Sequence, residues 1–236
     1  MGHYPVFLEL AARPVLLVGG GHVAAEKLPR LVEAGAEVTI VAEALSPDVR
    51  AYVDSGRATW RQRGYERGDL AGFELLFIAN DDGAANEAIA AEARELWIWV
   101  NAADDPARCD FILPSVAQRG AISIATTTGG SSPALARWLR EQMEAFLSDE
   151  VEALAELLAD VRSELRVGDV ACAATCARAG VPPPLLCAAC PRRIPPERWQ
   201  QAIDAELRSL LRARDRDGAR ARLERALSGD PPVVRA

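Results

Sequence analysis

The chain has 236 residues, of which 50% are hydrophobic and 26% are charged. This composition is typical of a globular protein with a buried core, and it excludes a disordered or collagen-like chain. The formal net charge of -7 argues against a nucleic-acid-binding surface, which needs clustered excess cations. The sequence contains no apolar run of the roughly 18 residues that a membrane span needs, and its start lacks a secretion-signal pattern. We therefore expect a cytoplasmic protein that binds neither nucleic acid nor membrane.

The first elements along the chain predict a β-α-β unit. Pro14–Gly20 is a short apolar run that ends in glycines, which is typical of a buried parallel strand. Apolar residues at helical spacing then predict a helix that begins at His22 and is closed by Gly35. Glu37–Val41 predicts the second strand of the unit.

The alternation of strands and helices continues over the next sixty residues. We expect strands over Ala58–Gln62, Glu74–Ala79 and Leu96–Asn101, and a helix over Gly83–Glu95. This alternation favours an α/β fold with a doubly wound parallel sheet of the Rossmann type. We assign residues 1–112 to this domain.

A different pattern follows Asp110. Phe111–Val116 and Ala121–Thr127 predict two short strands separated by Gln118-Arg119-Gly120, and Ala134–Phe146 predicts a helix. A two-stranded unit is marginally stable by itself. We therefore expect residues 113–147 to form a small α+β dimerisation segment.

The rest of the chain, residues 148–236, is predicted to be a helical C-terminal region with a cysteine-containing insertion. Leucines and valines recur at helical spacing over Glu150–Leu165. A break rich in Ala, Cys and Pro follows over Val167–Pro196, and Glu197–Leu227 predicts one or two further amphipathic helices.

The turn after the first strand fits the dinucleotide-binding pattern G-x-G-x-x-G/A. Gly19 permits a tight turn, Gly21 lets the backbone approach a pyrophosphate, and Ala24 lets the helix pack closely on the strand. The N-terminus of that helix would offer free N–H groups to the phosphates. The pattern favours a bound NAD, with a ligand-free turn as the alternative.

Acidic residues follow two neighbouring strands of the predicted sheet. Asp104 comes soon after Leu96–Asn101, where the carboxyl end of a strand faces the ligand crevice, and it is our candidate for a catalytic base. Asp81, Asp82 and Asp105 are interpreted as helix N-caps or turn residues.

Four cysteines form two pairs in the C-terminal region. Two readings remain open for them, a zinc or iron–sulfur site and a loop with thiols or disulfides. The candidate ligands are Cys172, Cys176, Cys187 and Cys190. The fifth cysteine, Cys109, is read as a small buried hydrophobic residue.

Several motifs occur together in one order along the chain. They are Tyr4-Pro5-Val6-Phe7, the glycine turn with Lys27 in its helix, Asn80-Asp81-Asp82, Asn101-Ala102-Ala103-Asp104, Cys109-Asp110-Phe111-Ile112-Leu113-Pro114, and the run from Thr128 to Ala136. In these motifs the chain resembles precorrin-2 dehydrogenase, the dehydrogenase/ferrochelatase module of siroheme synthase. The resemblance runs from about Tyr4 to Phe146.

The resemblance implies NAD-dependent oxidation of the tetrapyrrole precorrin-2 to sirohydrochlorin. In some members the same site also inserts ferrous iron as a substrate to give siroheme, and the family is homodimeric. A competing hypothesis from another class is a non-catalytic sensor of NAD or tetrapyrrole redox state on the same fold. Steady NADH production with precorrin-2 would discriminate between the two.

The resemblance also implies roles for individual residues. The essential aspartate of the family corresponds to Asp104, and a regulatory hydroxyl position corresponds to Thr128. Dinucleotide contacts correspond to His22, Val23, Glu43 and Ala44. We assign substrate binding to Thr128, Gly129 and Ser131.

Two sets of charged residues have a second reading. Glu43 lies where an acidic group meets the adenosine ribose and would repel the 2′-phosphate of NADP, or it is a solvated loop carboxylate. Arg119, Arg137 and Arg140 lie near the predicted cleft in sequence and could bind substrate carboxylates, but they are read as solvated surface.

Overall fold

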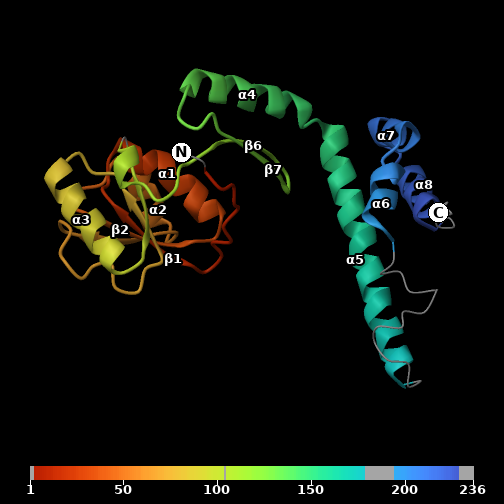
Figure 1. Ribbon diagram of the computed structural model, residues 1–236, viewed down its shortest axis with the longest axis horizontal. Helices are drawn as coiled ribbons and strands as arrows, with labels where there is room; N and C mark the ends of the chain where they lie inside the picture. Colours follow the sequence, from red (N-terminus) through yellow and green to blue (C-terminus); the bar gives the residue numbers. More distant parts are fainter. Residues whose placement is uncertain (1–2, 104, 179–193, 229–236) are drawn as a thin grey trace. The chain divides into compact units, whose positions relative to one another are not determined.

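The computed structural model describes residues 3–103, 105–178 and 194–228. The chain divides into two compact units, Met1–Leu113 and Pro114–Ala236 (Figure 1). The first contains the expected parallel sheet, and the second contains a hairpin followed by helices.

Five parallel strands form the sheet of the first unit. They are β1 Pro14–Val18, β2 Glu37–Ala42, β3 Thr59–Gln62, β4 Leu75–Ile78 and β5 Trp99–Ala102, in the spatial order β3-β2-β1-β4-β5. Every neighbouring pair is parallel, so all five carboxyl ends lie at one edge of the sheet. The predicted Rossmann-type α/β fold is confirmed.

Three helices cover this sheet: α1 His22–Glu33, α2 Pro47–Asp54 and α3 Gly83–Glu95. Gly35 follows α1 with a φ of +78°, as its predicted role at the helix end requires. Helix α2 was not predicted from the sequence. Its signal is the Ser46-Pro47 pair, because Ser46 Oγ accepts a hydrogen bond from the backbone of Val49 and Pro47 begins the helix.

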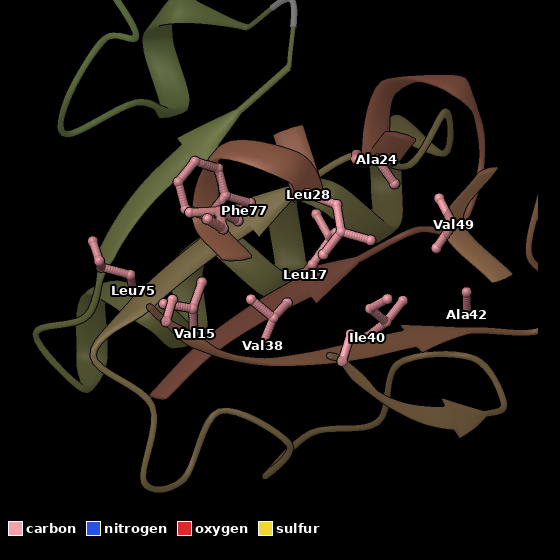
Figure 2. Close-up of a cluster of buried hydrophobic side chains, with 14 residues drawn as sticks. Val15, Leu17, Ala24, Leu28, Val38, Ile40, Ala42, Val49, Leu75 and Phe77 are labelled. Atoms are coloured by element: carbon pink, nitrogen blue, oxygen red, sulfur yellow. The ribbon is translucent and has the colours of Figure 1, made fainter. Parts of the chain in front are cut away.

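Two apolar clusters pack on the two faces of the sheet. Alternate residues of β1 divide between them, so that Leu17 joins the cluster under α1, together with Leu28 and Ile40, and Leu16 joins the cluster that includes Ile89 of α3. Figure 2 shows the first of these clusters. Burying each of these large side chains contributes about 1.5–3 kcal/mol. The core thereby fixes the ends of the strands where the site is built.

The second unit begins with an antiparallel hairpin, β6 Ser115–Arg119 and β7 Ile122–Thr126, followed by helix α4 Pro133–Phe146. The strand predicted over Phe111–Val116 is wrong at its start. Phe111 packs instead against the core of the first unit, with its ring 5.7 Å from that of Phe77 and nearly perpendicular to it. The predicted turn is also corrected, since Arg119 is the last residue of β6 and Gly120, at a φ of +52°, begins the turn.

Helix α5 covers Asp149–Arg178 and is longer than predicted. The predicted break from Val167 is wrong over 167–178, where four alanines favour a helical backbone. Three helices follow rather than one or two: α6 Pro196–Ala202, α7 Ala205–Arg212 and α8 Arg216–Ser228. Their apolar faces pack on α5 around Leu157, Val161, Leu207 and Leu223.

Candidate functional site

The glycine turn joins β1 to α1 and follows a path that excludes other side chains at two positions. Gly19 has a φ of +115°, and a Cβ there would lie 2.1 Å from the carbonyl oxygen of Ala79. A Cβ at Gly20 would lie 2.2 Å from the carbonyl oxygen of Ala44. The turn is therefore packed between the loops that follow β4 and β2, and these positions accept glycine alone.

Gly21 differs from its two neighbours, because a Cβ at this position would have no atom within 4 Å. Gly21 is the N-cap of α1, makes no side-chain cap, and precedes a first turn without acidic residues. The N–H groups of His22, Val23 and Ala24 thus lie at an open, positive helix end. This arrangement is compatible with the pyrophosphate of a dinucleotide, and binding at this turn stays a prediction.

The loop after β2 lies against this turn. The backbone N–H of Ser46 donates to the carbonyl oxygen of Gly20 at 2.8 Å, which holds Glu43 and Ala44 beside the glycines. The side chain of Glu43 is exposed and lies directly beyond the last residue of β2. It is available to a ribose hydroxyl, and its ribose role stays a prediction.

A buried carboxylate shapes the loop after β3. Asp69 is 7% exposed and accepts hydrogen bonds from Arg63, from Arg61 and from the backbone N–H of Glu66. The hydrogen bonds from Arg63, opposed by burial, lower the pKa of Asp69 to about 2. The loop at this end of β3 is thereby fixed by an ionised group.

The end of β4 connects the glycine turn to the end of β5. The N–H of Ala79 donates to the carbonyl oxygen of Val18 at 2.7 Å, beside the turn. On the other side of β4, the N–H of Ala103 donates to the carbonyl oxygen of Ile78 at 2.9 Å. Two backbone hydrogen bonds thus link the glycine turn to the residue that precedes Asp104.

Two acidic residues near these strand ends have the capping roles that were expected from the sequence. Asp82 caps α3 by accepting from the N–H groups of Ala84 and Ala85, and Asp105 caps the short 3-10 turn Pro106–Arg108. Asp81 is exposed. Asp104 lies outside the described residues, so its catalytic role stays a prediction.

Residues 109–111 lie alongside β5 and are held to this strand by hydrogen bonds. The carboxylate of Asp110 accepts from the N–H of Val100 at 2.9 Å, and the N–H of Asp110 donates to the carbonyl oxygen of Val100 at the same distance. Cys109 is half-buried, and its Sγ accepts from the N–H of Ala102 at 3.2 Å. Cys109 therefore acts here as a hydrogen-bonding partner as well as a packing residue.

A polar pair that sequence reasoning missed lies at the same strand end. Lys27 Nζ, on α1, donates to Oδ1 of Asn101 at 3.2 Å, and Asn101 is 5% exposed. The two residues are 74 positions apart, so no local pattern could have joined them. Two features of the sequence point to this pair: Lys27 is the single lysine of the chain, and both residues lie in the motifs that carry the family resemblance.

The proposed substrate residues lie in the turn before α4, in the second unit. Thr128 Oγ1 accepts from the N–H of Ser132, Ser131 Oγ donates to the carbonyl oxygen of Thr128, and Gly129 has a φ of +62°. These hydroxyls therefore build the turn itself. Ser132 in turn caps α4 by accepting from the N–H of Leu135.

Two of the arginines near these motifs, Arg119 and Arg140, make ion pairs within their own unit. Arg119 binds Glu152, Asp149 and the carbonyl oxygen of Leu147. Arg140 pairs with Glu144, and Arg137 is exposed.

The candidate metal ligands are only partly covered by the structure. Cys172 and Cys176 lie on α5 in a stretch whose side chains are not described, and Cys187 and Cys190 lie outside the described residues. Within the described ranges, no group of three His, Cys, Asp or Glu side chains could hold a metal ion. Over the same part of the chain, no helix is long and apolar enough to cross a membrane.

Comparison with known families gives two matches, in order along the chain. Residues 6–115 match the family described as "Putative NAD(P)-binding", and residues 119–145 match "Sirohaem biosynthesis protein central".

Among curated proteins, the chain is 42% identical over 166 residues to the siroheme synthase of Methylococcus capsulatus, which covers 70% of this chain and 35% of that protein. It is 37% identical over 166 residues to the siroheme synthase of Actinobacillus pleuropneumoniae serotype 3, covering 70% of this chain and 34% of that protein. The chain spans about a third of the length of these relatives.

Among solved structures, the fold is similar to that of SirC, a precorrin-2 dehydrogenase, with a TM-score of 0.69 and 22% identity. The superposition covers 95% of this chain and 98% of that one. At this level of identity the likeness concerns the fold.

Proposed function

This chain belongs to the siroheme synthase family, whose N-terminal module it contains, and from that premise we propose that it is an NAD-dependent precorrin-2 dehydrogenase. The observation that carries the proposal is the order of two matched regions. A dinucleotide-binding region, with its glycine turn open at Gly21, precedes a segment characteristic of sirohaem biosynthesis proteins.

NAD rather than NADP is the proposed cofactor. The phosphates would lie at the N-terminus of α1, against the N–H groups of His22 and Val23. Glu43 follows β2, where its carboxylate would accept a hydrogen bond from the ribose and repel a 2′-phosphate. Ala44 would contribute a backbone contact beside the turn.

The reaction removes two hydrogens from precorrin-2. When bound, NAD supplies the acceptor for the hydride, which carries two electrons and leaves NADH as product. Asp104 takes the proton that leaves the macrocycle, so that charge and atoms balance with sirohydrochlorin as the other product. Its place in the sequence, directly after Ala103 at the end of β5, supports this role.

The turn before α4 is the proposed substrate-binding segment. Gly129 and Gly130 both have positive φ, and the side chains of Thr127 and Ser131 are exposed next to Thr128. The hydroxyls of Thr128 and Ser131 donate within the turn and hold its shape. The exposed hydroxyl of Thr127, which accepts from the N–H of Gly129, would donate its own proton to a carboxylate of the tetrapyrrole.

A homodimer is proposed on the evidence of α4. No residue of this amphipathic helix is buried, although its apolar side chains recur at helical spacing. Leu135, Trp138 and Phe146 are 46%, 53% and 60% exposed. A second copy of this segment would cover these side chains by an isologous contact.

Iron insertion is the second activity that we propose for the same site. Its support is the 42% identity to a protein named siroheme synthase, since siroheme is the iron-containing product. In this step ferrous iron is a substrate, the nitrogens of the macrocycle become its ligands, and two N–H protons leave the macrocycle.

Anaerobic incubation with precorrin-2 and NAD tests the function directly, with absorbance followed with and without ferrous iron. We expect sirohydrochlorin and NADH in equal amounts, and conversion to siroheme where iron is present. Binding of NAD and precorrin-2 without NADH production would contradict the proposal and favour a sensor.

A further inference from the structure

A groove in the second unit lies outside every site described above. It is formed by the end of β6, the start of α5 and the turn between α7 and α8, and its volume is about 780 Å³. Small-molecule sites in proteins typically have volumes of roughly 300–1,000 Å³. The groove is therefore large enough for an organic ligand.

The lining of the groove combines positive charge with apolar surface. Ala153 and Leu211 provide the apolar surface, and Asp149 and Glu150 are its carboxylates. Its arginines are Arg119, Arg212, Arg214 and Arg216. The lining thus has an excess of positive charge, in a chain whose formal net charge is -7. This combination suits an anion with an apolar body.

Two of these arginines are held in place by ion pairs. Arg119 is bound by carboxylates of α5, and Arg216 donates to Glu156 at 3.0 Å and to Asp160 at 2.8 Å. A guanidinium group has five N–H donors, so both arginines keep further donors. Their side chains are already ordered, which lowers the entropic cost of binding a ligand beside them.

The other two arginines have more donors available. Arg212 donates to Glu150 at 3.0 Å, and its side chain is 55% exposed. Glu150 is also bound by Arg208 and does not depend on Arg212. The exposed side chain of Arg214 makes no hydrogen bond or ion pair with the residues that the structure describes. Arg212 and Arg214 can therefore bind carboxylates through paired N–H groups.

The backbone of Arg214 gives independent support for a role of its side chain. Arg214 has a φ of +59°, and its N–H donates to the carbonyl oxygen of Leu211 at 3.0 Å, just after the end of α7. Glycine is the usual residue at such a helix end, because other side chains are strained in this conformation. Strained residues of this kind cluster at functional sites. An arginine at this position therefore indicates a function that glycine would not supply.

The groove and the proposed substrate turn lie at opposite ends of the hairpin. Arg119 pairs with Ile122 beside the hairpin turn, whereas Ser115 pairs with Thr126, next to the turn before α4. At about 3.3 Å per residue, β6 separates its two ends by about 13 Å. The groove is therefore a separate site within the second unit.

We propose that this groove is a second binding site for the tetrapyrrole, in which Arg212 and Arg214 bind carboxylates of the macrocycle. Ala153 and Leu211 contact the apolar ring system. The identity of the ligand rests on the proposed function, because precorrin-2 and sirohydrochlorin are the carboxylate-bearing macrocycles of that reaction. The site itself rests on the lining of the groove.

The test is an anaerobic titration with sirohydrochlorin in the absence of NAD, which measures the number bound per chain. The variant combines Arg212→Gln with Arg214→Gly. Glutamine keeps the helix propensity of Arg212, and glycine suits the φ of Arg214. Arg225→Gln is the matched control, because it removes a positive charge from an exposed position on α8 outside the groove.

We expect two sirohydrochlorin molecules per chain in the parent and in Arg225→Gln, and one in the double variant. Each single variant should raise the Kd of the weakened site at least about tenfold, since it loses a hydrogen bond between charged groups. The unfolding midpoint of Arg214→Gly should equal or exceed that of the parent, so lost binding would not reflect lost folding.

Equal stoichiometry in the parent and the folded double variant would overturn the groove as a binding site. If the double variant does not fold, parental Kd values in Arg214→Gly would overturn it equally. Loss of one bound equivalent on addition of millimolar inorganic phosphate alone would reject the tetrapyrrole in favour of small anions. A parent that makes no NADH from precorrin-2 would reject the proposed function, whereas the loss of one equivalent in the double variant would still support the groove.

Discussion

The three neighbouring glycines of the turn after β1 differ in the space that surrounds them. Gly19 and Gly20 lack room for a side chain because carbonyl oxygens of Ala79 and Ala44 lie where a Cβ would stand. Gly21 has open space and an ordinary φ of −87°. A side chain at Gly21 is therefore compatible with the fold, and it would occupy the space proposed for the phosphates.

Gly21→Asp should weaken NAD binding without unfolding the protein. An aspartate at the N-cap would accept from the free N–H groups of α1 and should add on the order of a few tenths of a kcal/mol to stability relative to glycine. The same carboxylate would repel the pyrophosphate, so we expect the Kd for NAD to rise at least about tenfold. Calorimetric titration and thermal unfolding measure the two effects, and a parental Kd would remove the turn from the cofactor site.

Asp69 should make the stability of the first unit dependent on pH. Its pKa is lowered to about 2, so its contribution is present above the unfolded value near 3.8 and is lost as pH falls through 2. Asp69→Asn should cost about 2 kcal/mol at pH 6, and about half of that at pH 3. Urea unfolding of both proteins at the two pH values measures this, and an equal difference at both would contradict the assignment.

At the scale of elements, β1, β2 and β4 were predictable because each is a largely buried apolar run bounded by glycines or polar residues. Strand β3, Thr59–Gln62, gave a weaker signal because none of its residues is buried. Helix α3 was predicted at its observed bounds, Gly83–Glu95. Helix α2 was missed because its buried face is reduced to Val49, which leaves little periodicity to detect.

One error beyond the sheet arose where a tertiary contact outweighs the local pattern. Phe111 looks like the start of a strand, but it fills the core beside Phe77 and leaves β6 to begin at Ser115. In the candidate site, the glycine turn and the capping aspartates follow from local motifs. The contact of Lys27 with Asn101 does not, because it depends on how α1 crosses the sheet.

The exposed apolar side chains of α4 lead to a prediction about assembly. Leu135→Glu combined with Trp138→Glu should convert a dimer into a monomer, because two charges would be buried at the proposed contact. Light scattering at micromolar concentration measures the mass. Arg137→Glu, on the exposed polar side of the helix, is the control and should remain dimeric. A monomeric parent would count decisively against the dimer.

At the scale of the whole molecule, parallel pairing explains why the cofactor turn and the acidic loop are neighbours. The carboxyl ends of β1, β4 and β5 are adjacent in the sheet, and backbone hydrogen bonds of Ala79 and Ala103 connect them. The order of the strands therefore brings together the two motifs to which the proposed dehydrogenation is assigned.

The role of Asp104 as the base is tested most directly by single-turnover oxidation of precorrin-2 by the Asp104→Asn variant with saturating NAD. The amide keeps the shape of the side chain and removes the base, so we expect a rate loss of about 10²–10⁴-fold with the Kd for NAD unchanged. The parent, measured in parallel, should form one NADH per sirohydrochlorin. Near-parental turnover by the folded variant, with its NAD affinity intact, would contradict the role of Asp104 as the base.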